Sequence, residues 1–344
     1  MATQPRITTL IDCDPGIDDL MALLYAYAHP QVDIAALIAT GGNVSTEQVG
    51  RNLRGALELV APFRPEASET PWVLGATVPV AQELTTTEET HGPLGTGYAR
   101  LPHQDVPTGR EEGRGVQMWV EAARRHPGSL HAIVLGPLTN LALALELEPE
   151  LPRLLASLHI MGGALNHRGN TMPTTEWNIH SDPEAAQRVF AAFDRDDAEC
   201  FPVLCPLDQT EKMVLTPQIR QCLTAGREES APLAALDDAL QFYMEFHETD
   251  GLGFISHVHD PFVTALAVNE ALRSAGEEDW VELGRTTATV IDVEVTGKLT
   301  RGQTIADWIG RWGRTPNAYA LTDADPRAFF NHYISTVRSA FVSH

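Results

Sequence analysis

The sequence predicts an α/β protein in which helices flank a mainly parallel central sheet. Three observations support this fold class. Short β-rich runs alternate with helical patterns from Ile7 to Cys205, as they do in βαβ units. Hydrophobic residues make up 43% and charged residues 20% of the 344 residues, which is typical of a globular chain. The chain shows no internal repeat, low-complexity tract or Pro/Ser-rich linker, so we expect residues 1–344 to form a single domain.

The expected elements follow one another in a regular order. In the parallel half, β-rich runs are expected at 7–14, 32–40, 71–76, 131–136, 158–164 and 199–206. Helical runs are expected at 18–29, 45–61, 137–147 and 182–193. The later part predicts helices at 231–247 and 259–272, a strand-like run at 285–297, and a closing strand and helix at 317–323 and 326–341. The polar segment from Thr77 to Arg114 is predicted to be an active-site loop, because structureless loops of that length are usually functional.

The charge balance bears on the possible partners. Acidic residues outnumber basic residues by 46 to 24, which gives a net charge of −22. Nucleic acids and anionic membranes are bound mainly through Lys and Arg, so we expect neither as a partner. The N-terminal segment lacks a signal-peptide pattern and no run approaches the ~20 apolar residues of a membrane span, so a soluble, cytoplasmic protein is expected. The cysteines lack CxxC pairing and are expected to be reduced and mostly buried; they are Cys13, Cys200, Cys205 and Cys222.

Polar clusters stand at the carboxyl ends of the expected strands. These ends read IDCDPGIDD, ATGGN, VLGPLTN and IMGGA, and each is rich in Asp, Asn, Thr or Gly. Ligands of open α/β sheets bind in the crevice outside the carboxyl ends of the strands. We therefore expect these segments to converge on one pocket.

The first of these segments is strongly acidic. Asp12 and Asp14 lie two apart on the expected strand, so they should face the same side, and Asp14 is expected to cap a helix that begins at Pro15. Asp18 and Asp19 fall in the first helical turn. Capping and the helix dipole explain one or two of these carboxylates, but four would repel one another unless a cation joined them. An all-oxygen set of ligands favours Ca²⁺ or Mg²⁺ over zinc.

Two further strand ends are ambiguous on their own. Taken alone, the GGN segment at 41–43 is better explained as a Gly-rich strand exit with Asn43 as a turn residue. The GPLTN segment at 136–140 is consistent with a simple strand-to-helix connection, although it brings the carbonyl of Leu135 to the same edge as the aspartates. No GKS or GKT follows it, so a phosphate loop is not indicated.

Two later segments carry further polar side chains. Asn170, Glu176 and Asn178 stand close together before a helix opened by Asp182. Glu176 and Asn178 should point the same way in an extended segment, and they offer the donors and acceptors that a polyol needs, but a polar loop explains them equally well. In HVHDP at 257–261, Asp260 is expected to be either a helix N-cap or a distant partner of the first acidic cluster.

As a set, the motifs resemble those of the inosine-uridine preferring nucleoside hydrolase family over nearly the full chain. In order they are DxDPGxDD at Asp12–Asp19, GN at Gly42–Asn43, GPLTN at 136–140, IMGGA at 160–164, ExN at Glu176–Asn178, HDP at 259–261 and TRGQT at 300–304. The resemblance implies an open, Rossmann-like nucleoside hydrolase fold. It implies Ca²⁺-dependent hydrolysis of the N-glycosidic bond of ribonucleosides in nucleoside catabolism and salvage, by a homodimer or homotetramer.

The resemblance also implies roles for individual residues. The implied metal ligands are Asp14, Asp19, the carbonyl of Leu135 and Asp260, with Asp12 in support. Asp14 would also accept the proton of the attacking water, and His259 would protonate the leaving base. The implied substrate contacts are Asp18 and Asn43 at the ribose hydroxyls, Asn170, Glu176 and Asn178 on the 5′ side, Met161 in the pocket, and His91, Tyr243 and His247 near the base.

The chain departs from the family pattern where the base is expected to bind. The helix before HDP often carries two tyrosines in the family, whereas here Tyr243 is followed by His247. Trp177 stands where Phe is common. His259, in place of the Trp of the purine-specific branch, resembles the pyrimidine-preferring or nonspecific branch.

Two other classes of protein stay open from the residues alone. A phosphohydrolase with an aspartyl nucleophile also begins with a strand ending in DxD, but it wants Thr or Val where this chain has Gly16, and a basic phosphate ligand that no motif supplies. A non-catalytic nucleoside- or sugar-binding protein would keep the ribose contacts without needing a water-activating Asp14.

Overall fold

The computed structural model describes residues 7–194 and 200–342. In this part of the chain an eight-stranded sheet has the strand order β3-β2-β1-β4-β5-β6-β12-β9. Its strands are β1 (Ile7–Cys13), β2 (Val32–Ala39), β3 (Trp72–Leu74), β4 (Leu130–Val134), β5 (Leu155–Met161), β6 (Pro202–Cys205), β9 (Gly284–Thr289) and β12 (Ala318–Ala324). All neighbours pair in parallel except β9, which runs antiparallel to β12. The predicted mainly parallel α/β sheet is confirmed.

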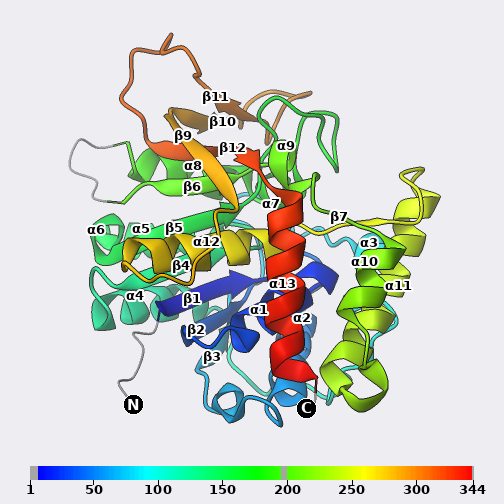
Figure 1. Ribbon diagram of the computed structural model, residues 1–344. Coiled ribbons are helices and arrows are strands. Elements are labelled where there is room, and N and C mark those ends of the chain that lie inside the picture. The colour runs from blue at the N-terminus through cyan, green and yellow to red at the C-terminus, as the bar shows by residue number, and fades with distance from the viewer. Residues whose placement is uncertain (1–6, 195–199, 343–344) are drawn as a thin grey trace.

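Helices cover both faces of this sheet (Figure 1). They are α1 (Ile17–Ala28), α2 (Thr46–Val60), α3 (Glu88–His91), α4 (Gly115–Arg125), α5 (Thr139–Leu147), α6 (Leu151–Leu154), α7 (Trp177–Ser181), α8 (Pro183–Ala192), α9 (Leu207–Thr210), α10 (Pro217–Leu223), α11 (Ala231–Thr249), α12 (Asp260–Ser274) and α13 (Pro326–Phe341). The apolar side chains of α1, α2, α11, α12 and α13 form one hydrophobic cluster, and those of α4, α5 and α8 form a second.

Two small ribbons complete the fold. They pair β7 (Val214–Leu215) with β8 (Ser256–His257) and β10 (Ile291–Val293) with β11 (Thr304–Ala306). The expected strand at 285–297 is therefore wrong as one element, because it divides between the main sheet and a ribbon. The expected strand at 199–206 begins in the structure at Pro202, and its residue Glu199 lies outside the described residues.

The sheet order explains where a ligand can bind. β1 lies between β2 and β4, so the chain leaves β1 toward one edge of the sheet and later returns to its other side. This reversal opens a crevice at the carboxyl ends of β1 and β4, the usual ligand site of open α/β sheets. The segment after β1 begins at Asp14, and the segment after β4 begins at Leu135.

Two sequence-based expectations about the chain can be compared directly with the structure. Within 7–194 and 200–342, no helix is both long enough and apolar enough to span a membrane. All four cysteines are free; Cys13, Cys200 and Cys205 are buried and Cys222 is exposed. The expectation of reduced, mostly buried cysteines agrees with this arrangement.

Candidate active site

A cavity of about 490 Å³ is lined by the segments that follow β1, β4 and β5. The predicted site residues that line it are Asp14, Asp18, Asn43, His91, Leu135, Met161, Asn170, Glu176, Asn178, Tyr243, His247, His259 and Asp260. Asp12 and Asp19 do not line it. The expected convergence of the strand ends on one pocket is thus observed.

The predicted loop between Thr77 and Arg114 contributes one wall of this cavity. Its residues 85–87 and 89–91 line the cavity, and it contains the short helix α3 instead of being wholly irregular. Arg168, Glu211 and His257 also line the cavity and were not among the predicted residues.

The carboxylate of Asp14 lies between two glycine-containing turns. Its Oδ2 atom accepts a hydrogen bond of 2.8 Å from the backbone N–H of Asn43. A Cβ atom on Gly42 would lie 2.2 Å from Oδ2, and one on Gly136 would lie 2.7 Å from Oδ1. Both turns therefore need glycine so that the backbone can approach the carboxylate, which gives the GGN and GPLTN segments a role beyond turning the chain.

The expected helix cap at Asp14 is wrong. Helix α1 begins at Ile17 with Gly16 as its N-cap, and Asp19 reaches back to accept hydrogen bonds from the backbone N–H groups of Asp14 (3.1 Å) and Gly16 (2.9 Å). Asp14 cannot serve as the cap because its side chain is directed toward Asn43 on another segment.

Three carboxylates from two distant segments meet beside Asp14. One oxygen each from Asp18, Asp19 and Asp260 lies within 4.8 Å of the others, and all three residues are buried. Of the two alternatives for Asp260, the helix cap is not observed. Asp260 is the first residue of α12, and its carboxylate faces the aspartates of α1, as expected for a distant partner of the acidic cluster.

Burial and mutual repulsion make the four carboxyl groups hard to ionise together. Burial, with Asp19 and Asp18 adding repulsion, raises the pKa of Asp14 well above its usual range. Burial and neighbouring carboxylates likewise raise the pKa of Asp260 well above that range and that of Asp18 to about 7. Burial raises the pKa of Asp19 to about 6 against several hydrogen bonds.

The donor set fits a hard divalent cation. Among the described residues, no ion pair joins any of these four aspartates to Lys, Arg or His. The carbonyl oxygen of Leu135 also lies at the cavity, where it accepts a 2.6 Å bond from Asn178 Nδ2. Carboxylate and carbonyl oxygens without His or Cys suit Ca²⁺ or Mg²⁺, whose charge would offset the repulsion.

Asp12 lies outside the cavity, although the strand alternation predicts that it faces the same side as Asp14. Because β1 ends at Cys13, the strand alternation does not extend to Asp14, and the two aspartates do not share the cavity. Asp12 instead accepts hydrogen bonds from Trp119 Nε1 (2.7 Å), Asn140 Nδ2 (3.3 Å) and the Thr40 hydroxyl. Burial raises its pKa to about 6. Its contacts join β1 to α4 and α5 without lining the cavity, which fits a supporting role.

Glu176 is held by backbone groups on the other side of the cavity. It is the N-cap of α7, so the expectation of an extended segment through Asn178 is wrong. Its carboxylate accepts hydrogen bonds from the N–H groups of Asn178 (2.8 Å), Ile179 (3.0 Å) and Gly163 (3.0 Å). Burial raises its pKa, and these three bonds oppose the rise. Asn170 Oδ1 binds the adjacent Trp177 N–H at 3.0 Å.

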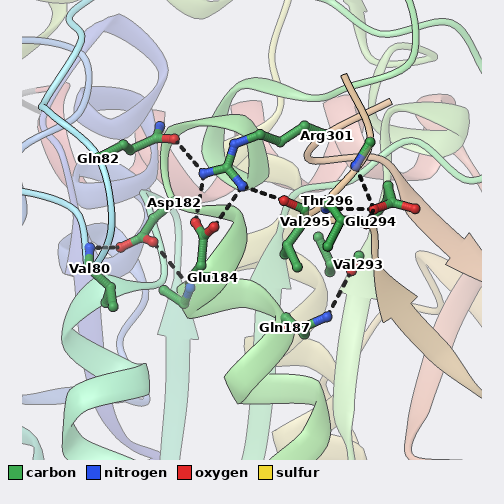
Figure 2. Close-up of polar contacts among 12 residues, drawn as sticks. Val80, Gln82, Asp182, Glu184, Gln187, Val293, Glu294, Val295, Thr296 and Arg301 are labelled. Carbon is green, nitrogen blue, oxygen red and sulfur yellow. Dashed lines mark hydrogen bonds and ion pairs between the residues drawn. The ribbon is translucent and has the colours of Figure 1, made fainter. Parts of the chain in front are cut away.

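A polar network supports this side of the cavity (Figure 2). Arg301 of the TRGQT motif forms paired contacts of 2.6 and 2.8 Å with Glu184 of α8, and it donates to Gln82 at 3.0 Å. Asp182 accepts from Val80 N–H at 2.8 Å, which ties the start of the active-site loop to the cap of α8. The motif therefore positions the loop and α8 without lining the cavity itself.

Aromatic side chains form the remaining wall. Tyr243 lies 5.5 Å from His91 and 4.6 Å from His247, measured between ring centroids. His257 continues the row, at 5.4 Å from His247 and 6.4 Å from His259. These rings offer a surface on which a planar base can lie.

Comparisons with known proteins agree with this arrangement. The model of the family described as "Inosine-uridine preferring nucleoside hydrolase" matches residues 9–331. The pyrimidine-specific ribonucleoside hydrolase RihA of Salmonella arizonae is 32% identical over 323 residues, which cover 93% of this chain and 94% of that protein. RihA of Salmonella agona is 33% identical over 322 residues, with coverage of 93% and 94%.

Solved structures show the same similarity. The purine-preferring ribonucleoside hydrolase from Gardnerella vaginalis superposes with a TM-score of 0.83 at 26% identity, over 97% of this chain and 98% of that chain. The plant nucleoside hydrolase PpNRh1 gives a TM-score of 0.82 at 25% identity, over 97% and 99%.

The fold and these matches define an enzyme of the nucleoside hydrolase class. The chain belongs to the inosine-uridine preferring nucleoside hydrolase family. The family resemblance drawn from the sequence motifs is therefore confirmed.

Proposed function

We propose that this enzyme is a Ca²⁺-dependent N-ribohydrolase that splits ribonucleosides into ribose and free base. The observation that carries the proposal is the convergence of Asp14, Asp18 and Asp260 with Glu176 and Asn178 in one cavity. The acidic side is suited to a cation and to a developing positive charge. The opposite side offers the mixed donors and acceptors that bind sugar hydroxyls.

The proposed cation ligands are Asp14, Asp19, Asp260 and the Leu135 carbonyl, with Asp18 directed toward the ribose hydroxyls together with Asn43. A bound Ca²⁺ would screen the carboxylates and lower the pKa of a coordinated water. Asp14 accepts the proton of the water that attacks the anomeric carbon. The surrounding carboxylates stabilise the oxocarbenium-like charge of the ribose as the bond to the base breaks, in a one-step displacement.

We propose uridine as the first substrate to examine. The curated relatives named above are called pyrimidine-specific, and His259 stands at the position where the purine-specific branch is expected to carry Trp. His259 would assist departure of the base by giving a proton or a hydrogen bond to it.

The test of the proposed function is release of ribose and base from uridine and inosine. We expect equimolar ribose and base. Turnover should be lost completely after treatment with a chelator and should recover when one equivalent of Ca²⁺ is restored, because without a cation the buried carboxylates repel one another. Chromatography of the base and a reducing-sugar assay would measure this. Full activity of protein shown to be metal-free would exclude a catalytic requirement for the cation. Tight nucleoside binding without any product would indicate a non-catalytic binding protein.

Nucleosides are expected to be better substrates than their 5′-phosphates. Each unit of negative charge on a phosphate at roughly 6 Å from the Glu176 carboxylate would cost about 3 kcal/mol at an effective dielectric constant near 20, or roughly 100-fold in kcat/KM. Arg168 also lines the cavity, but it is exposed and paired with Glu211 at 3.1 Å. The measurement compares uridine with its 5′-monophosphate, and Glu176→Gln should narrow the difference. Similar kcat/KM values for both substrates in the unaltered enzyme would contradict this charge argument.

A further inference from the structure

The hydrogen bonds of the histidine wall determine which ring nitrogens are available to a substrate. His247 has both nitrogens occupied: Nδ1 binds the carbonyl of Tyr243 at 2.8 Å, and Nε2 lies 3.4 Å from the backbone N–H of His257. His247 therefore lines the cavity but can offer a base only the face or edge of its ring. The base contact expected at this residue is thus limited to packing.

His257 differs from His247 because only one of its two ring nitrogens forms a hydrogen bond within the described residues. Its Nδ1 lies 2.7 Å from the backbone carbonyl of Glu211, and because a carbonyl only accepts, Nδ1 must carry the hydrogen. In the neutral ring this leaves a lone pair on Nε2. Within the described residues Nε2 has no hydrogen-bond partner, and it does not belong to the buried polar atoms that lack one, so it stays accessible in the cavity.

The backbone around His257 fixes this ring in place. His257 is the second residue of strand β8 and pairs with Val214 of β7, and its backbone N–H is bound to the His247 ring. The side chain is held by the backbone carbonyl of Glu211, which lies between α9 and β7. Because both its backbone N–H and its Nδ1 atom are hydrogen-bonded, His257 presents the Nε2 acceptor in a defined direction. Selective recognition of a hydrogen-bond donor requires such a fixed acceptor.

The position of His257 relative to the reacting centre indicates which part of a substrate it would meet. The backbone N–H of His259 lies 3.4 Å from Asp18 in the acidic cluster, so His259 borders the sugar site. The ring of His257 lies next to that of His259, inclined by 27° with centroids 6.4 Å apart. His257 is thus one ring further along the wall that the base would occupy, toward the base edge remote from the sugar.

We propose that His257 is a specificity-determining residue of this enzyme: its Nε2 atom accepts a hydrogen bond from a ring N–H on the remote edge of the nucleobase. This inference rests on the proposed hydrolysis of nucleosides and names the preferred class, in which the base carries an imide or lactam N–H, as uracil and hypoxanthine do. Neutral cytosine has nearly the same shape as uracil but a lone pair at ring position 3. Two acceptors would then face each other without a hydrogen between them, and uridine is preferred over cytidine.

The test compares uridine, cytidine and p-nitrophenyl riboside in the full-length enzyme with its metal bound. The unaltered enzyme should prefer uridine over cytidine by roughly 10- to 100-fold in kcat/KM, the usual effect of leaving a buried polar group unpaired. His257→Phe should lower kcat/KM for uridine until the preference is nearly lost. His257→Gln should keep activity on uridine but gain activity on cytidine, because an amide can turn to accept from one base and donate to the other.

The nitrophenyl substrate separates this role from a structural one. It lacks the ring N–H, so both variants should hydrolyse it within about twofold of the unaltered enzyme. An unchanged ratio of uridine to cytidine in His257→Phe would overturn the assignment of His257, as would equal losses on all three substrates. If the unaltered enzyme hydrolyses none of the three, the proposed function fails, and the inference about His257 falls with it.

Discussion

Replacing Asp14 by Asn is expected to lower kcat on uridine by several orders of magnitude. Asp14 Oδ2 lies in a fixed position against the Asn43 N–H, and the carboxylate is enclosed by Gly42 and Gly136. The amide of Asn keeps the size of the side chain but removes the negative charge and the proton acceptor. Loss of a general base alone costs roughly 10²–10⁴-fold, and loss of a metal ligand adds to it.

Measurements of Ca²⁺ binding divide this effect between the two causes. Calorimetric titration of Asp14→Asn gives the loss in cation affinity, and kcat at saturating Ca²⁺ gives the loss of the base. Asp105→Asn is a suitable control, because it makes the same chemical change at an exposed residue of the loop. A change in kcat of less than tenfold at saturating Ca²⁺ would contradict the assignment of Asp14 as the base.

Local patterns predict the sheet, but they misplace the cap at Asp14 and do not decide between cap and cluster for Asp260, because tertiary contacts decide both. Alternating β-rich and helical runs identify the strands because buried parallel strands read as continuous apolar segments. Asp14 followed by Pro15 fits the rule for a helix N-terminus, yet the side chain is used by Asn43, which is 29 residues away. Asp260 fits the same rule before Pro261, yet it faces Asp18 and Asp19 on α1. A carboxylate that contacts residues of another segment cannot at the same time accept hydrogen bonds from the first N–H groups of the helix that follows it.

The candidate site could be predicted only as far as its motifs extend. The strand-end rule locates the cavity and collects most of its polar residues, since parallel strands end at one edge. His257 carries no such signal: its importance depends on the carbonyl of Glu211, 46 residues away, and on the full use of both nitrogens of His247. Hydrogen-bond partners across that separation are set by the packing of β7 against β8, which no local pattern reports.

The second large effect is expected at His259 and should depend on the leaving group. Burial and the neighbouring histidines hold the pKa of His259 well below its usual range, so the ring is neutral. Its Nδ1 lies 2.9 Å from the Thr210 hydroxyl, which can donate to it and so leave the hydrogen on Nε2, from which the neutral ring can donate a hydrogen bond to the departing base. A nucleobase leaves poorly as an anion, whereas nitrophenolate leaves readily without a proton. His259→Ala should therefore slow hydrolysis of uridine by roughly 10²–10⁴-fold and leave p-nitrophenyl riboside nearly unaffected.

A second variant tests whether the orientation of this ring matters. Thr210→Val removes the hydroxyl beside Nδ1 while keeping the size of the side chain, so it should reduce turnover of uridine by a smaller factor and again spare the nitrophenyl substrate. Kinetics on both substrates at saturating Ca²⁺ provide the comparison. Because His259 precedes Asp260 and its N–H contacts Asp18, a disturbance of the acidic cluster would slow both substrates alike. Equal losses on the two substrates would therefore assign His259 to support of the carboxylates and not to departure of the base.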